Sequence, residues 1–269
     1  MLEVTIDESI PLETCVAALR KRPSSLLVDV DGTISPIVDD PLSAYVLPGC
    51  RDALGILASR LDLVGVVSGR AADRARLMVG LDSIEYWGGH GATHLTKETI
   101  QVAPEAQKFI EAAEHVQHAI MDWDLPSGIL VEPKGTSVAV HYRQALDPAQ
   151  ARDSLYARLS PLAKSSGLDL LEGRRVFELR PPGMGKGRCI EQVIHERGLS
   201  GVVYVGDDQT DVEAFAAVET WRNTGPDRAG VTVAVKNPEA TKRLFRSADY
   251  LVDGVQGVER LLQGLAQRF

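Results

Sequence analysis

The chain has 269 residues, of which 44% are hydrophobic and 25% charged, with a formal net charge of −8 at pH 7. This composition is ordinary for a globular protein of one large domain or two smaller ones. It excludes a membrane span, because no stretch approaches the roughly 18 apolar residues that one requires. The acidic balance argues against a nucleic-acid or anionic-membrane partner, so a bound phosphate would have to be attracted by a metal or by a few cations.

The first predicted strand, residues 25–28, is followed by Asp29, Asp31, Gly32 and Thr33. Side chains two residues apart on a strand point the same way, so the two carboxylates converge at the carboxyl end of the strand, where open α/β sheets bind ligands. Like charges at that distance repel each other unless a cation, a proton or a hydrogen-bond donor compensates. A simple polar turn would use the same residues. The motifs further along the chain decide between a turn and a site.

A helix over residues 48–60 and a second strand over residues 61–67 follow, and a third strand is expected at residues 84–87. The second strand ends at Ser68, which Gly69 and Arg70 follow. A serine before a helix is commonly an N-cap, and the same position can present a hydroxyl and backbone N–H groups to a phosphate. Two roles are open for the arginine, which are contact with a phosphate and pairing with a nearby acid.

The pattern changes in the middle of the chain. A helix, two strands, a helix and two strands are predicted there, at residues 104–121, 129–133, 137–142, 148–164, 168–171 and 176–179. This order indicates a compact antiparallel sheet backed by two helices. We therefore expect an inserted α+β cap domain at residues 103–182, between a first core part at residues 1–102 and a second core part at residues 183–269.

From Lys186 onward the alternation of helices and strands returns, which predicts a Rossmann-like parallel sheet with helices on both faces. The lysine itself is flanked by glycines at a helix start, which alone is a weak signal. Asp207, Asp208 and Asp211 follow a strand, and three aspartates in five positions exceed what a helix dipole requires. Carboxylates clustered in this way suit Mg²⁺. The elements are predicted at residues 187–197, 202–205, 212–218 and 231–235, with a terminal helix after residue 253.

In this order the four clusters resemble the haloacid dehalogenase (HAD) superfamily of aspartate-dependent phosphatases. The segment Asp29-Val30-Asp31-Gly32-Thr33 matches its first motif, Ser68 its second, Lys186 its third and Asp207-Asp208 its fourth. A closer resemblance, to the trehalose-6-phosphate phosphatase family, covers nearly the whole chain. It rests on Val67-Ser68-Gly69-Arg70, Gly89-His90-Gly91, Val131-Glu132-Pro133-Lys134, His141-Tyr142-Arg143, Glu178-Leu179-Arg180-Pro181 and Gly206-Asp207-Asp208-Gln209-Thr210-Asp211.

The resemblance implies phosphoryl transfer to an aspartate, with Mg²⁺ as the cofactor. Asp29 would be the nucleophile and Asp31 the general acid and base. The metal would be bound by Asp29, Asp207 and the backbone carbonyl of Asp31. Two roles stay open for Asp208 and Asp211, which are ligation of the metal through water and orientation of the catalytic lysine.

The resemblance also implies substrate contacts in both domains. Lys186 and Ser68 would act as catalytic groups that hold phosphate oxygens. Glu132, Lys134 and Glu178 in the cap would bind sugar hydroxyls, although exposed charges that alternate with core residues on a strand give the same pattern. The other candidate substrate contacts, with a structural alternative for the histidines and for Arg143, are Gly32, Thr33, Ser68, Gly69, Arg70, His90, His141 and Arg143.

The expected function is therefore Mg²⁺-dependent hydrolysis of trehalose 6-phosphate to trehalose through an aspartyl-phosphate. One alternative is a HAD phosphatase for another sugar phosphate, of the sucrose phosphate or glycosyl phosphoglycerate type. A second is a phosphosugar mutase, which would release little phosphate. A non-catalytic sugar-phosphate sensor would not need both Asp29 and Asp31 intact.

The N-terminal residues and the cysteines indicate where the protein is located. Residues 1–8 lack the basic start and apolar centre of a signal peptide. Cys15, Cys50 and Cys189 are widely scattered, without the spacing of a disulfide or zinc framework. We expect a cytoplasmic protein, and we expect a monomer whose partner is a small-molecule sugar phosphate.

Overall fold

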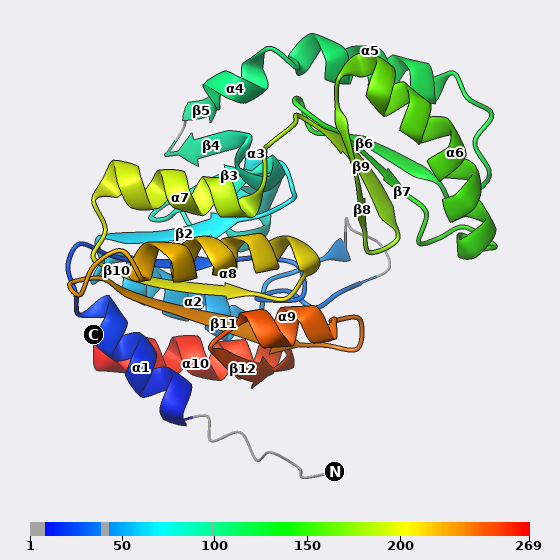
Figure 1. The fold of residues 1–269 in the computed structure, drawn as a ribbon. Coiled ribbons are helices and arrows are strands. Elements are labelled where there is room, and N and C mark those ends of the chain that lie inside the picture. Colours follow the sequence, from blue (N-terminus) through cyan, green and yellow to red (C-terminus); the bar gives the residue numbers. More distant parts are fainter. Residues whose placement is uncertain (1–8, 39–42, 98) are drawn as a thin grey trace. The chain divides into compact units, whose positions relative to one another are not determined.

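The computed structural model describes residues 9–38, 43–97 and 99–269 (Figure 1). Residues 1–8, on which the signal-peptide argument rests, lie outside the described residues. The chain divides into two compact units, a core unit of Met1–Ile100 with Gly185–Phe269 and a cap unit of Gln101–Met184. Within the described ranges, every helix is too short or too polar to cross a membrane.

The larger sheet has eight strands in the order β12-β11-β10-β1-β2-β3-β4-β5 (Figure 1). Neighbouring strands from β12 to β3 run parallel, and β4 runs antiparallel to β3. The expected α/β class with a Rossmann-like parallel sheet is confirmed. The strands are β1 (Ser24–Val28), β2 (Leu63–Val67), β3 (Glu85–Gly88), β4 (Thr93–Thr96), β5 (Thr99–Val102), β10 (Gly201–Gly206), β11 (Ala229–Lys236) and β12 (Tyr250–Asp253).

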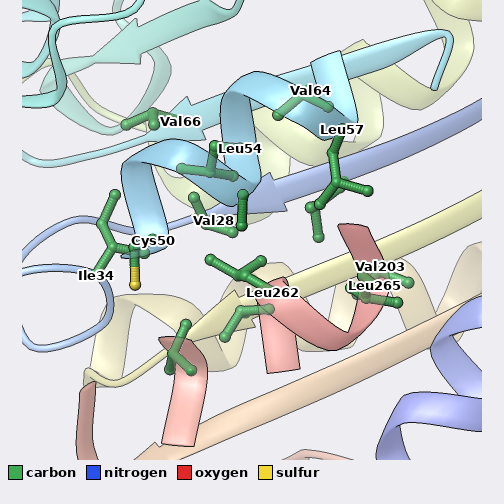
Figure 2. Close-up of a cluster of buried hydrophobic side chains, with 14 of the residues drawn as sticks. Val28, Ile34, Cys50, Leu54, Leu57, Val64, Val66, Val203, Leu262 and Leu265 are labelled. Atoms are coloured by element: carbon green, nitrogen blue, oxygen red, sulfur yellow. The ribbon is translucent and has the colours of Figure 1, made fainter. Parts of the chain in front are cut away.

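Helices cover both faces of this sheet because its central strands are apolar on both sides. On β1, Leu26 and Val28 belong to one buried cluster and Leu27 to another. Figure 2 shows part of the first cluster, in which Leu54 and Leu262 from two helices lie with Val28. The first cluster includes residues of α1 (Ser9–Leu19), α2 (Pro48–Ala58), α3 (Ala72–Val79) and α10 (Gly254–Arg268), and the second includes residues of α7 (Lys186–Arg197), α8 (Gln209–Arg222) and α9 (Lys242–Ser247).

The cap unit contains a four-stranded antiparallel sheet in the order β6-β7-β9-β8. Val140 and Phe177 pack in one buried cluster with apolar residues of helices α5 and α6. Alternation along the strands then places Glu132, His141 and Glu178 on the opposite side, here called the polar face. The expected insert, an antiparallel sheet backed by two helices, is confirmed. Its elements are α4 (Pro104–Gln107), α5 (Ile110–Met121), β6 (Leu130–Pro133), β7 (Val138–His141), α6 (Pro148–Ser166), β8 (Asp169–Gly173) and β9 (Val176–Arg180).

The prediction of one continuous helix at residues 104–121 is wrong. The chain leaves helical geometry at Phe109, whose φ and ψ are −103° and 1°, so that α4 ends before it and α5 begins after it. Phe109 packs against the buried cluster of the cap unit, and this packing favours the break between α4 and α5. Short or evenly apolar elements without a clear periodicity were not predicted at all, namely α1, α3, β4, β5, α9 and β12.

Candidate active site

Asp29 and Asp207 lie close together at the carboxyl ends of adjacent strands. β1 and β10 pair in parallel with Val28 opposite Val205, and the backbone N–H of Asp29 donates to the carbonyl of Val205 at 2.9 Å. Both aspartate side chains are buried, with residue exposures of 5% and 0%. The parallel register therefore brings together two acids that are far apart in the sequence.

The buried ammonium group of Lys186 contacts one member of this pair, Asp29, and a third aspartate, Asp211. Its Nζ lies 2.9 Å from Oδ1 of Asp29 and 2.7 Å from Oδ1 of Asp211. Lys186 is the first residue of α7, and Asp211 lies in the first turn of α8. The two helices approach each other closely at Gly187, where a Cβ atom would lie 2.8 Å from the carbonyl oxygen of Glu213. The glycine after the lysine thus permits the helix packing that brings the lysine to its partners.

Four hydrogen bonds occupy the carboxylate of Asp211. Its Oδ1 accepts from Nζ of Lys186 and from the hydroxyl of Tyr204, both at 2.7 Å. Its Oδ2 accepts from the backbone N–H groups of Asp207 and Asp208, at 2.9 and 2.8 Å. A carboxylate has about four lone-pair sites, so protein donors already saturate Asp211. Of the two roles that the sequence leaves open for it, this geometry favours orientation of the lysine.

Asp207 is held from three sides. Its Oδ2 accepts a hydrogen bond from Nδ2 of Asn237 at 2.9 Å, and its Oδ1 accepts one from the hydroxyl of Thr33 at 3.4 Å. The third side is Gly32, which has a φ of 86°, in the region that favours glycine. A Cβ atom there would also overlap the carboxylate of Asp207. A glycine is therefore required at position 32 for two reasons, namely the positive φ and the lack of space for a Cβ atom beside Asp207.

Burial and neighbouring charge control protonation at the site. Burial raises the pKa of Asp29 to about 7, while Lys186 opposes this shift and Asp211 and Asp31 add to it. Burial alone would lower the pKa of Lys186, but the carboxylates of Asp211 and Asp29 outweigh it and raise that pKa. When Asp29, Asp207 and Asp211 are all ionised, these four described side chains carry two negative charges in excess.

This excess charge and the donor set fit a divalent cation. One carboxylate oxygen from each of Asp29, Asp207 and Asp211 lies within 4.8 Å of the others. Carboxylate oxygens are the ligands that Mg²⁺ prefers in proteins. Because Asp211 already accepts four hydrogen bonds, Asp29 and Asp207 are the carboxylates that remain available to an ion. Asp208 has another contact, since its side chain caps α8 by accepting from the backbone N–H of Gln209 at 2.6 Å.

Arg70 pairs with an acid, which was one of its two open roles. Its Nε and Nη2 atoms lie 2.6 and 2.8 Å from the two carboxylate oxygens of Asp31, a bidentate ion pair. The backbone N–H of Arg70 donates to the hydroxyl of Ser68 at 3.1 Å. Ser68 is itself buried directly after β2. The loop after β2 thus pairs Arg70 with Asp31 and places the buried hydroxyl of Ser68 at the carboxyl end of β2.

His90 supports the loop after β2. It lies in the short helical turn Gly89–Gly91 with a φ of 58°, and its backbone N–H donates to the carbonyl of Ser68 at 2.9 Å. Its imidazole packs on Gly69, where a Cβ atom would lie 2.8 Å from the ring. These contacts fit the structural alternative for His90, and they also place it near Ser68, where a phosphate contact stays open.

The cap candidates form two pairs on and beside the polar face. Nε2 of His141 lies 2.8 Å from Oε2 of Glu132, and Nζ of Lys134 lies 3.4 Å from Oε2 of Glu178. The hydroxyl of Ser137 donates to the other oxygen of Glu178 at 2.7 Å, which fixes this buried carboxylate.

The described contact of Arg143 is with another part of the cap unit. It follows β7, and its Nη2 donates to the carbonyl of Arg174, in the turn between β8 and β9, at 3.3 Å. Lys134 and Ser137 lie at the opposite end of β7, between β6 and β7. Among the described contacts, four of the five cap candidates pair with one another, and Arg143 contacts the turn between β8 and β9.

Three contacting residues escaped the sequence analysis, namely Tyr204, Asn237 and Ser137. Asn237 carried a usable signal, because it is a polar residue two positions after the end of the strand predicted at residues 231–235. Tyr204 lies inside an apolar strand and is read as core, and nothing local marks Ser137. Tyr204 contacts Asp211 in the next helix, and Ser137 contacts Glu178, which is 41 residues away in the sequence.

Comparison with known proteins extends this picture. The sequence matches the family model of trehalose-phosphatase over residues 27–249. A trehalose-phosphate phosphatase of Mycobacterium tuberculosis is 34% identical over 244 residues, which cover 83% of this chain and 58% of that protein. An uncharacterized glycosyl hydrolase of the same organism is 33% identical over 215 residues, which cover 74% of this chain and 16% of that protein.

The fold is also shared with a solved structure. A trehalose-6-phosphate phosphatase related protein superposes with a TM-score of 0.76 at 25% identity, covering 91% of this chain and 97% of that one. The chain spans less than two thirds of each curated relative named above. Because the family match extends over most of the sequence, the resemblance inferred from the motifs is confirmed, and the chain belongs to the trehalose-phosphatase family.

Proposed function

We propose that this chain is a Mg²⁺-dependent phosphatase that hydrolyses trehalose 6-phosphate to trehalose and phosphate. The observation that carries the proposal is Asp29, buried at a strand end beside Asp207 with an oxygen 2.9 Å from Nζ of Lys186, in a chain of this family. A phosphate monoester is anionic and resists attack by a carboxylate unless its charge is neutralised. A buried aspartate next to a buried cation is suited to that attack.

The reaction then has two steps. An oxygen of Asp29 attacks phosphorus to form an aspartyl-phosphate, the bond from phosphorus to the sugar oxygen breaks, and Asp31 gives that oxygen a proton. Next a water molecule loses a proton to Asp31 and attacks the same phosphorus, which releases phosphate and the free carboxylate of Asp29. Arg70 supports both steps by orienting the carboxylate of Asp31 through two hydrogen bonds.

The metal would be bound by Asp29, Asp207 and the backbone carbonyl of Asp31. When bound, Mg²⁺ supplies positive charge that neutralises the phosphate and the attacking carboxylate. Asp211 would orient the catalytic lysine, because its oxygens already accept four hydrogen bonds. Asp208 would serve as the cap of α8 and contact the metal only through water.

The phosphate would be held by Nζ of Lys186 and by the hydroxyl of Ser68. Support comes from the burial of both groups and from the contact of the lysine with the nucleophile. Backbone N–H groups that follow a strand end are common phosphate donors. The residues that we assign to this phosphate pocket besides the two catalytic groups are Gly32, Thr33, Gly69, Arg70 and His90.

The sugar would be recognised by the polar face of the cap sheet. Glu132, Lys134 and Glu178 offer charged donors and acceptors, and ionised groups form the stronger hydrogen bonds. Ser137 holds Glu178 in one orientation at 2.7 Å, as a specific site requires. His141 would orient Glu132, with which it pairs at 2.8 Å, and Arg143 would be a peripheral contact.

The same proposal places the protein in the cytoplasm as a monomer. Cys15, Cys50 and Cys189 are all free and buried, which suits a reducing compartment.

Phosphate release from a panel of sugar phosphates, with Mg²⁺ and with excess EDTA, tests the proposed function. Trehalose 6-phosphate should be the best substrate, and EDTA should abolish turnover because the buried carboxylates then lack their counter-charge. A preference for sucrose phosphate or a glycosyl phosphoglycerate would replace the substrate and keep the chemistry. Isomerisation of a sugar phosphate with little phosphate release would indicate a mutase, and full turnover in EDTA would contradict the metal requirement.

A further inference from the structure

Asn237 contacts Asp207 from the neighbouring strand. It directly follows β11, and the pairing of Gly206 with Ala234 brings the ends of β10 and β11 together. Its Nδ2 donates to Oδ2 of Asp207 at 2.9 Å, while its Oδ1 accepts from the backbone N–H of Glu239, also at 2.9 Å. An amide whose oxygen is bound by an N–H turns its NH₂ group the other way. The turn after β11 therefore fixes which end of the amide faces the acid.

This contact has the properties that a metal ligand requires of its support. Asp207 has no exposed surface, so solvent does not orient its carboxylate. The hydrogen bond that it accepts from Asn237, at 2.9 Å, is shorter than the one from Thr33, at 3.4 Å. The amide is also neutral. It can therefore orient the carboxylate without competing with a cation for its negative charge, which a lysine in the same place would do.

We infer that Asn237 is a positioning residue for the divalent cation and sets the affinity of the site through Asp207. The inference rests on the proposed function, because the cation belongs to the proposed phosphatase chemistry. Loss of a hydrogen bond that orients a metal ligand typically costs ~10- to 100-fold in metal affinity. The role is separate from catalysis, since Asn237 acts through Asp207.

The experiment is calorimetric titration of the 269-residue chain with Mg²⁺ alone, in the absence of any sugar phosphate. Asn237→Ala should raise the Kd for Mg²⁺ by ~10- to 100-fold. Asn237→Ser should do the same, because a serine hydroxyl can still accept from the N–H of Glu239 but is too short to reach Asp207. The serine variant keeps the test valid if the alanine variant folds poorly.

The matched control is Thr241→Ala, in the same loop. The hydroxyl of Thr241 accepts from the backbone N–H of Leu244 at 3.3 Å and caps α9, so its removal loosens the loop without touching Asp207. Its Kd should stay within about twofold of that of the parent, as expected for an independent site. Urea unfolding of each variant without metal completes the comparison, and Asn237→Ser should unfold close to the parent.

The outcomes separate this inference from the proposed function. If the parent binds Mg²⁺ and Asn237→Ser binds it with the same Kd, the positioning role of Asn237 is overturned. The proposed phosphatase function is then unaffected. An equal loss of affinity in Thr241→Ala would also overturn the role of Asn237, because loop order would then be the cause. A parent that binds no Mg²⁺ would contradict the metal-dependent function itself and this inference with it.

Discussion

Asp29 is the residue on which the proposed chemistry depends. Asp29→Asn preserves the size of the side chain and removes the attacking anion, so turnover of trehalose 6-phosphate should fall by ~10³-fold or more. Asp31→Asn should allow some attack and slow the breakdown of the aspartyl-phosphate, because the base is lost. Steady-state phosphate release and acid-quench trapping of the phosphorylated protein distinguish the two variants. Near-parental turnover in Asp29→Asn, or a phosphoryl group trapped elsewhere, would exclude Asp29 as the nucleophile.

At the same scale, the contacts of Asp211 predict that it contributes to the free energy of unfolding. It is a buried partner of Lys186 and accepts four hydrogen bonds. Asp211→Asn leaves a buried ammonium without this partner, so the free energy of unfolding should fall by about 3–5 kcal/mol, as is typical when one member of a buried pair is removed. Urea unfolding monitored by circular dichroism measures this loss.

The matched control for that variant is Tyr204→Phe, which removes one hydrogen bond to the same carboxylate and keeps both charges. Its cost should be smaller, about 1.5–3 kcal/mol, the usual range for a hydrogen bond to a charged group. If Asp211→Asn costs no more than Tyr204→Phe, then charge pairing with Lys186 is not what holds the site together.

At the scale of single elements, α6 depends on its first turn. The side chain of Asp147 accepts from the backbone N–H groups of Ala149 and Gln150, both at 3.0 Å, and so caps the helix. Asp147→Ala should lower the free energy of unfolding by ~0.5–2 kcal/mol. Asp147→Ser should recover most of the loss, because serine is also a good cap. Urea unfolding of the three proteins makes the comparison.

A second acidic residue of α6 controls for the change in charge. Asp153 is exposed in the same helix and pairs only with its neighbour Arg152 among the ion pairs described for it. Asp153→Ala should change the unfolding free energy by less than about 0.5 kcal/mol. Equal effects of Asp147→Ala and Asp153→Ala would mean that capping contributes nothing to α6.

At the scale of the whole molecule, the cap unit is proposed to serve specificity and the core unit chemistry. Ala substitutions at Glu132, Lys134 and Glu178 should lower kcat/KM for trehalose 6-phosphate by roughly 10- to 10³-fold, since hydrogen bonds to charged groups are lost. The same variants should hydrolyse p-nitrophenyl phosphate near the parental rate, because this small substrate has no sugar for them to bind. Lys186→Ala should impair both substrates. Kinetics on the two substrates side by side provide the measurement.

Folding needs its own control in this experiment. Glu178 and Lys134 form a buried pair, so removal of one deprives the other of this partner. Glu178→Gln retains the hydrogen bond from Ser137 and the side-chain volume, and it should lose sugar selectivity without the stability cost of Glu178→Ala. Equal losses on both substrates in all cap variants would assign these residues to the fold and remove them from sugar recognition.

The sequence by itself determined the fold class and the main site candidates, because both follow from local sequence patterns. Buried parallel strands read as apolar runs, and the groups after them, Asp29, Ser68 and Asp207, must gather at one edge of the sheet. The cap sheet and its two helices could also be predicted, from the alternation of apolar residues and from helical periodicity. The elements α1, α3, β4, β5, α9 and β12, and the break at Phe109, could not be predicted, because tertiary packing and not local pattern stabilises them.

Only the tertiary structure decided how the site residues divide their roles. Asp211 and Asp207 look alike in the sequence, yet one is saturated by Lys186, Tyr204 and two backbone groups while the other is steered by Asn237. The pairing of Arg70 with Asp31 was one of two local possibilities until the strands placed them together. Hydrogen bonds between residues far apart in the chain depend on strand register and helix packing, and no local pattern encodes those distances.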